Sequence, residues 1–203
     1  MNEAIDQASK GWQPPCLIKP TDYKASCDEG IAPPDDAASG TKEAEMGVNW
    51  PVPAGGWDIA SLTELFASDP EALGDVDVEV GEGSDVLHIT LKERGGLSVL
   101  MVSSGEQILC SALLIAAERV PNRPAFERTL LSVHKLIPLS NFSITTIENA
   151  EWYELFGALS SRSDADALVE EVAVLAANAG DAAEWISEWI AADGDVSKLG
   201  ELA

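Results

Sequence analysis

Apolar and polar residues alternate along the chain between residues 76 and 118, which is the period of a β-strand with one buried face. Val76, Val78 and Val80, for example, are separated by Asp77 and Glu79. The pattern runs through segments divided by glycine-containing turns: residues 76–80, 87–91, 97–101 and 106–118. The last segment is the most uniformly apolar. Together they predict a four-stranded antiparallel meander.

Elsewhere apolar residues recur every three or four positions, which is the period of a helix. The first such segment follows Asp58, a suitable N-cap, and the second follows Asn122, with Pro124 in the first turn. The third begins at Asp164 and is long. It has an apolar stripe (Leu168, Val172, Leu175, Ala179, Ala182, Ile186, Trp189) and an opposite acidic face (Asp166, Glu170, Glu171, Asp181, Glu184, Glu188).

Residues 142–147 and 152–159 read as a β-hairpin that turns at Glu148-Asn149-Ala150. The expected order of elements is therefore α-β-β-β-β-α-β-β-α. Antiparallel strands in runs, with helices between the runs, predict an α+β fold in which an antiparallel sheet carries helices on one side.

The first 55 residues differ from the rest, because they are rich in proline and show neither period. We interpret residues 1–55 as a flexible or disordered N-terminal tail, 56–192 as the α+β domain and 193–203 as a frayed C-terminus. A misassigned start codon, with the true start at Met46, is an alternative explanation of the tail.

The charge balance is strongly acidic: 35 Asp and Glu against 12 Lys and Arg give a formal net charge of -23. Such a surface repels phosphate backbones and anionic headgroups, so we expect neither nucleic-acid binding nor charge-driven binding to a membrane surface. The lack of a long apolar run also predicts no direct insertion into a membrane. No secretory signal is visible, no run of 18 apolar residues occurs, and the cysteine count of three is odd. These features favour a cytoplasmic protein.

Motifs for catalysis are missing from the sequence. There are two histidines, His88 and His134, and no nucleophile elbow, phosphate-binding loop or dinucleotide fingerprint. Cys16 and Cys27 are not at zinc-binding spacing. We therefore predict no catalytic, cofactor-binding or metal-binding residue and no cofactor, and we expect that the protein is not an enzyme.

Two groups of residues remain as candidates for partner binding. Arg119, Arg123 and Arg128 gather with Lys135 in one short segment of an otherwise acidic chain. They either pair with acidic residues of the same molecule or form a basic spot for an acidic peptide. The second group consists of large aromatic side chains, Trp152, Trp185 and Trp189. They either pack in the core or anchor a partner.

Two strings, Leu-Ile-Pro-Leu-Ser-Asn-Phe-Ser-Ile at 136–144 and Trp-Tyr-Glu-Leu-Phe-Gly-Ala-Leu-Ser at 152–160, resemble the YjfI family of bacterial proteins of unknown function. The similarity runs from about residue 57 to 190. It implies a small cytoplasmic protein, and association with a phage-shock-protein-A-like coiled-coil membrane-stress protein as partner. The order of elements is also similar to that of type III secretion chaperones, which bind extended peptides as dimers, so a homodimer is implied as well.

These observations favour an acidic cytoplasmic protein that acts as a non-enzymatic, chaperone-like or adaptor module for protein binding. One alternative is an enzyme with an unrecognised site, assembled from scattered residues such as His134 and nearby carboxylates. A second alternative is an acidic mimic of nucleic acid, which would need carboxylates spaced like phosphates along one ridge.

Overall fold

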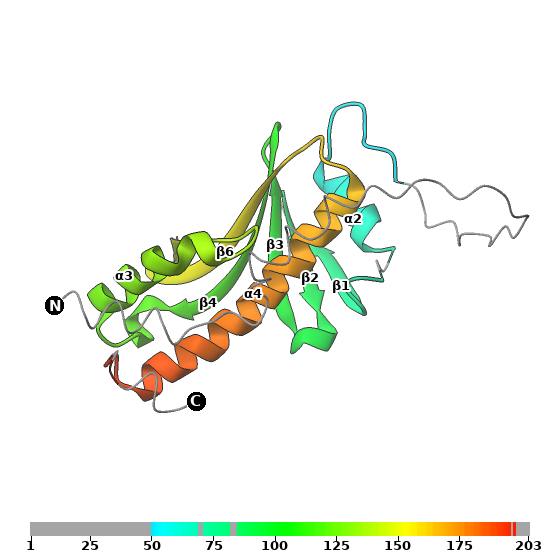
Figure 1. Ribbon diagram of the computed structural model, residues 1–203. Helices are drawn as coiled ribbons and strands as arrows, with labels where there is room; N and C mark the ends of the chain where they lie inside the picture. Colours follow the sequence, from blue (N-terminus) through cyan, green and yellow to red (C-terminus); the bar gives the residue numbers. More distant parts are fainter. Residues whose placement is uncertain (1–49, 69–70, 82–84, 196, 198–203) are drawn as a thin grey trace, which may run out of the picture. The chain divides into compact units, whose positions relative to one another are not determined.

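The segments of alternating residues form an antiparallel meander in the computed structural model, which describes residues 50–68, 71–81, 85–195 and 197 (Figure 1). Each strand begins within a few residues of its expected position, because the turns that separate the strands are set by local glycines. The strands are β1 (Val76–Val80), β2 (Val86–Leu91), β3 (Leu97–Ser103) and β4 (Gln107–Ala116).

The predicted hairpin consists of β5 (Asn141–Ile147) and β6 (Ala150–Ser160). Glu148 and Asn149 at its turn have φ values of 48° and 69°, as a two-residue turn between right-twisted strands requires. β6 pairs with β4, so the described strands form a six-stranded sheet in the order β1-β2-β3-β4-β6-β5. β5 is consequently one edge of the sheet and β1 is the other.

Three helices complete the predicted order among the described residues, namely α2 (Ile59–Phe66), α3 (Arg123–Val133) and α4 (Ala165–Ala191). Short 3-10 turns occur at Lys92–Arg94, Ala117–Arg119 and His134–Leu136, and are labelled η1, η2 and η3. The α+β prediction and its order of elements are confirmed. None of the described helices is both long enough and apolar enough to cross a membrane.

Two of the three described helices are capped by the side chain of the residue that precedes them. Asp58 accepts a hydrogen bond from the backbone N–H of Ser61, and Asp164 accepts one from the N–H of Ala167. Asn122 stands at the N-cap of α3, but its side chain does not cap the helix and its φ is 50°. Its amide instead donates to the carbonyl of Gly194 beyond the end of α4, so the predicted role was wrong.

All three helices lie on the same face of the sheet, as predicted. α4 crosses this face and contacts β3, β4 and β6 (Figure 1). α2 contacts β1 and β2. Phe126 of α3 packs against Tyr153, on the same face of β6 as Leu155 beneath α4. The stripe of α4 that was predicted to be apolar is buried throughout, and its seven residues contribute to this core.

The prediction is wrong for one residue of the acidic face of α4, which is buried. Glu171 is only 5% exposed, although it was assigned to the solvated side. It directly precedes Val172 of the apolar stripe, so its side chain lies at the border of the buried face. The free-energy cost of burying this carboxylate depends on the groups that it contacts.

The ends of the predicted domain extend slightly further than expected. Trp50 lies in the segment assigned to the tail, yet it is partly buried against the core. After α4, the N–H of Gly194 donates to the carbonyl of Trp189, which closes the helix end. The rest of the tail prediction, and the alternative start at Met46, lie outside the described residues.

Candidate interaction surfaces

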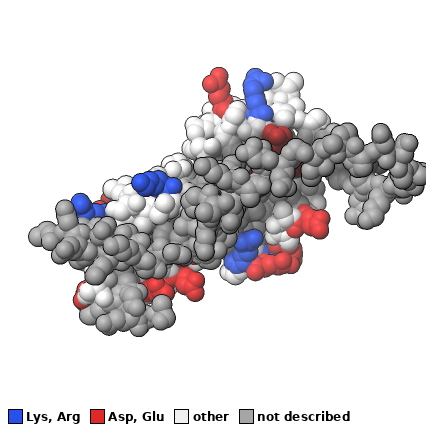
Figure 2. All heavy atoms as spheres, viewed as in Figure 1, with Lys and Arg blue, Asp and Glu red and all other residues white. Residues whose placement is uncertain are grey.

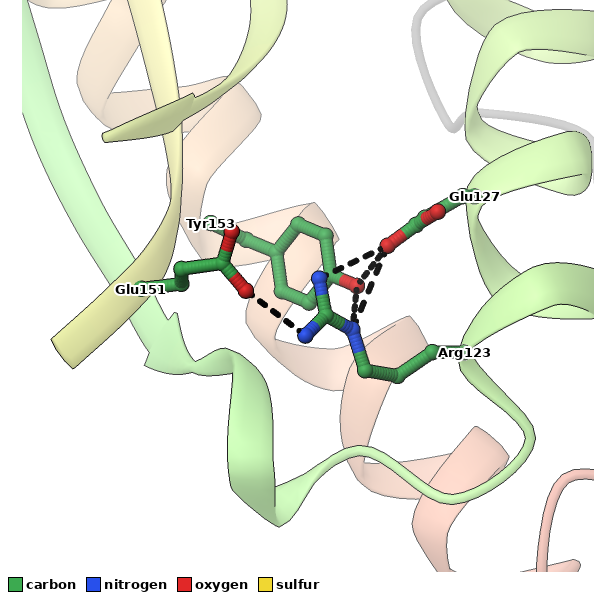
Figure 3. A network of polar contacts seen from close by, with 4 residues as sticks. All are labelled: Arg123, Glu127, Glu151 and Tyr153. Atoms are coloured by element: carbon green, nitrogen blue, oxygen red, sulfur yellow. Dashed lines mark hydrogen bonds and ion pairs between the residues drawn. The ribbon is translucent and has the colours of Figure 1, made fainter. Parts of the chain in front are cut away.

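Arg123, at the start of α3, is held by three side chains (Figure 3). Its Nη2 lies 3.0 Å and its Nε 3.2 Å from Oε1 of Glu127 on the same helix, and its Nη1 lies 2.8 Å from Oε2 of Glu151 on β6. The hydroxyl of Tyr153 accepts from Arg123 Nε at 3.2 Å and donates to Glu127 Oε1 at 2.9 Å. This network joins α3 to β6.

The network satisfies the charge of Arg123. Its hydrogen bonds to Glu151, Tyr153 and Glu127 raise the pKa of the guanidinium, which therefore stays charged. Burial raises the pKa of Tyr153, and the hydrogen bond to Glu127 raises it further, so the phenol stays protonated. Two carboxylates surround one guanidinium, so Arg123 is already paired within its own molecule, which is the first of the two roles considered for it.

The other predicted basic residues are exposed and lie along the same segment. Arg119 is in η2 and Arg128 is on α3, and neither has an ion pair among the described residues. Figure 2 shows Lys and Arg side chains in the region of α3. A small basic area therefore remains beside the paired Arg123.

The three candidate tryptophans occupy different environments. Trp189 is fully buried, and its indole N–H donates to the carbonyl of Pro121 at 2.9 Å, so it is a core residue. Trp185 is partly exposed and stacks on Phe126, with ring centroids 5.2 Å apart. Trp152 is partly exposed on β6, on the face of the sheet that the helices leave open. Only Trp152 and Trp185 can therefore contact a partner.

The open face of the sheet carries a row of apolar side chains that the sequence analysis did not single out. The strand register places Val86 beside Val102, Val102 beside Leu109, and Leu109 beside Ala158. The row thus crosses β2, β3, β4 and β6 without a polar residue. Leu109, at the centre of the row, is 37% exposed.

A second row on the same face adds larger side chains. Leu100 lies beside Ser111, which lies beside Phe156, and both apolar residues are partly exposed. We call these two rows the open-face patch, formed by Val86, Leu100, Val102, Leu109, Phe156 and Ala158. The sequence signal for this patch was the uniformly apolar segment at residues 106–118, which contains β4.

The two segments that resemble the YjfI family meet under α4. Asn178 of α4 donates to the carbonyl of Pro138 at 2.9 Å and to the hydroxyl of Ser140 at 2.8 Å. Gly157, in the second segment, lies against Glu171 of α4. These residues hold α4 on the sheet, so this part of the resemblance reflects the fold.

Cys110 and Glu171 are the buried ionisable groups of this region. Burial raises the pKa of the Cys110 thiol, and the charge of Glu171 raises it further, so the thiol is protonated and a weak nucleophile. Burial also raises the pKa of Glu171, with a smaller effect from Glu170. Its Oε1 has no hydrogen-bond partner among the described residues.

The two histidines occupy different positions on the sheet. His88 faces the open side of the sheet opposite Leu100, and His134 accepts a hydrogen bond at Nδ1 from the backbone N–H of Phe142. In the part of the chain that the structure describes, no three His, Cys, Asp or Glu side chains come close enough to hold a metal ion.

Residues 56–190 match a family model described as "Uncharacterized protein conserved in bacteria (DUF2170)". The "Uncharacterized protein YjfI" of Escherichia coli K12 is 26% identical over 133 residues, which cover 66% of this chain and 97% of the relative. The same figures hold for the protein of that name in E. coli O157:H7. The crystal structure of YbjN from E. coli has a TM-score of 0.43 and 12% identity, covering 60% of this chain and 89% of YbjN.

Proposed function

The chain belongs to the DUF2170 family of uncharacterised bacterial proteins, and from this premise we propose that it is a non-enzymatic adaptor that binds another protein through the open-face patch. The proposal places it in the bacterial cytoplasm, a reducing compartment that suits the free thiol of Cys110.

The observation that carries the proposal is the composition of the uncovered face of the sheet. A sheet with one solvated face normally carries polar residues there. In this protein the central row of that face is apolar from Val86 to Ala158, and Leu109 at its middle is 37% exposed. Contiguous exposed apolar surface with a polar surround is typical of a protein interface.

The borders of the patch indicate the chemistry of the partner. Glu79 of β1 lies on the same face beyond β2, and Glu154 of β6 lies next to Phe156 along the strand. Asp77, also on this face of β1, is paired with Lys92 at 2.8 Å. A partner that complements this surface presents an apolar stripe flanked by Lys or Arg. An amphipathic helix has this arrangement.

A coiled-coil protein similar to phage-shock protein A is the candidate that the family resemblance suggests, and the helices of coiled coils are amphipathic. The proposal therefore predicts direct binding between the full-length chain and the phage-shock-protein-A-like protein of the same bacterium. Binding is measured with purified proteins by isothermal titration calorimetry, with a negative heat-capacity change as the sign of apolar burial.

The test compares two variants that place the same charge at sites of equal exposure. Leu109→Asp puts a carboxylate at the centre of the patch, and we expect affinity to fall by at least about tenfold. Ile190→Asp changes a residue of α4 that is also 37% exposed, and we expect no change. If the two variants bind equally well, the patch is not the contact surface. If the wild-type chain does not bind, the named partner is wrong.

A further inference from the structure

Glu154 of β6 is a carboxylate on the sheet that lacks a cationic partner. The described strands contain acidic residues but neither lysine nor arginine. Asp77 of β1 pairs with Lys92, and Glu151 of β6 pairs with Arg123. Glu154 has no ion pair with any described residue. A cation that neutralises it must therefore come from outside the described part of the chain.

The surroundings of Glu154 on the open face of the sheet are mainly apolar. Trp152 and Phe156 are two positions before and after it on β6, so the three side chains share one face at spacings of roughly 7 Å. The strand register places Leu113 of β4 on its third side and Ser143 of β5 on its fourth. All of these side chains are partly exposed, so a ligand can reach the carboxylate between two aromatic rings.

Partial burial disfavours the charged form of Glu154. It raises the pKa of the carboxyl group, whereas a hydrogen bond from Ser143 has a smaller, lowering effect. A partly buried carboxylate without a counter-ion retains a desolvation cost that a bound cation offsets. Ionisable groups in such an environment are concentrated at functional sites.

We propose that Glu154 binds the guanidinium group of an arginine side chain that the partner presents, with Trp152 and Phe156 on either side of it. These three residues are called the Glu154 site. The inference rests on the proposed function, because the site borders the open-face patch and shares Phe156 with it. It adds the identity of the partner residue that is held at this border.

The chemistry of the site favours arginine over lysine. A guanidinium group is planar, so it donates two parallel hydrogen bonds to one carboxylate and also stacks on aromatic rings. It is more weakly hydrated than an ammonium group, so it loses less solvation beside Leu113 and the two rings. An aromatic ring within about 6 Å of the cation adds attraction through its π-face. A partner helix with one arginine beside its apolar stripe therefore fits both the site and the patch.

Arginine alone tests the site in the absence of any protein partner. The probe is N-acetyl-arginine amide, titrated into the nitrogen-labelled full-length chain and followed by NMR at the indole N–H of Trp152. This signal is identified by its loss in Trp152→Leu. We expect a saturable shift with a Kd on the order of 10 mM, because a single side chain makes the contact. N-acetyl-citrulline amide has the same shape without the charge and should bind at least about tenfold more weakly.

Three variants separate charge, ring and background effects. Glu154→Gln keeps the size of the side chain and removes its charge, so the arginine probe should bind at least about tenfold more weakly. Phe156→Leu removes one ring and should weaken binding about two- to fivefold. Glu148→Gln removes a charge from the exposed turn between β5 and β6 and should leave binding unchanged.

Three results would overturn the inference: no saturable shift at Trp152, equal binding of the two probes, or equal binding of the arginine probe to the wild type and Glu154→Gln. Failure of the proposed function looks different. If the arginine probe binds as expected and the phage-shock-protein-A-like protein does not, the Glu154 site stands and the named partner is wrong. If that protein binds through Leu109 but equally well to Glu154→Gln, the adaptor proposal stands and the arginine contact is wrong.

Discussion

The carboxylate of Glu171 on α4 occupies the space that a side chain at Gly157 of β6 would fill. A Cβ added to Gly157 would overlap with Oε1 of Glu171 and would lie 3.2 Å from the carbonyl oxygen of Leu139. Gly157 pairs with Cys110 on β4, so this contact lies over the middle of the sheet. The absence of a side chain at Gly157 therefore allows α4 to lie over the sheet with a carboxylate beneath it.

Gly157→Ala should destabilise the fold by about 1–3 kcal/mol, because the added methyl group displaces Glu171 and presses on the carbonyl of Leu139. Urea unfolding followed by circular dichroism measures the change. The double variant Gly157→Ala/Glu171→Ala should lose less stability than the sum of the single variants. Strictly additive losses would show that the two residues do not compete for the same space.

Glu171→Gln should make the protein more stable at pH 7 by about 1–3 kcal/mol, because the neutral amide does not carry the desolvation cost of a buried carboxylate. Burial raises the folded-state pKa of Glu171 above its ordinary value of 4.5. A raised pKa means that the stabilising contribution of this group is present below pH 4.5 and is lost as the pH rises through the folded-state value.

The difference in unfolding free energy between Glu171→Gln and the wild type should therefore be smallest near pH 4 and grow toward neutral pH. Urea titrations at several pH values measure it. Glu184→Gln, at an exposed position of the same helix, is the matched control for the loss of one acidic side chain. A difference for Glu171→Gln that does not change with pH would contradict the burial of its carboxylate.

Tyr153→Phe should cost about 0.5–1.5 kcal/mol, because it removes the hydroxyl that links Glu127 to Arg123 while leaving the buried ring in place. Thermal unfolding monitored by calorimetry checks this value. In a cycle with Arg123→Ala, the two changes should be coupled, since both residues bond to Glu127. Independent losses would mean that the network of Figure 3 does not act as a unit.

Trp185 and Trp189 should respond differently to the same substitution. Trp189→Phe leaves a buried gap and removes the donor to the carbonyl of Pro121, so we expect a loss of about 2–4 kcal/mol. Trp185→Phe changes a partly exposed ring that stacks on Phe126, and should cost about 1 kcal/mol or less. Equal losses in chemical denaturation would contradict the different burial of the two residues.

Local patterns in the sequence predicted the elements of the fold, because each element depends on residues close together in the chain. The turn at Glu148 and Asn149 and the caps at Asp58 and Asp164 are of this kind. Asn122 shows where local sequence patterns fail to predict a contact. It is a suitable cap by type, but Gly194 competes for its side chain, and that contact links residues far apart in sequence.

The candidate surfaces were harder to predict, because they depend on the pairing of strands. Val86 and Ala158 belong to one apolar row only because β6 inserts between β4 and β5, which alternation within a strand does not reveal. The basic and aromatic residues were found by type, yet Arg123 is paired with carboxylates and Trp189 is buried. Glu171 was misplaced because it borders the apolar stripe.

The pairing of β4 with β6 has a consequence for synthesis of the protein on the ribosome. Ala116 of β4 pairs with Trp152, and Gln107 pairs with Ser160, so the strand that completes the sheet is made well after β4. At about 5–20 residues per second, β4 waits on the order of seconds for its neighbour. During that time β4, the most apolar strand, is the unpaired edge of the nascent meander. Such an edge favours aggregation and the binding of chaperones.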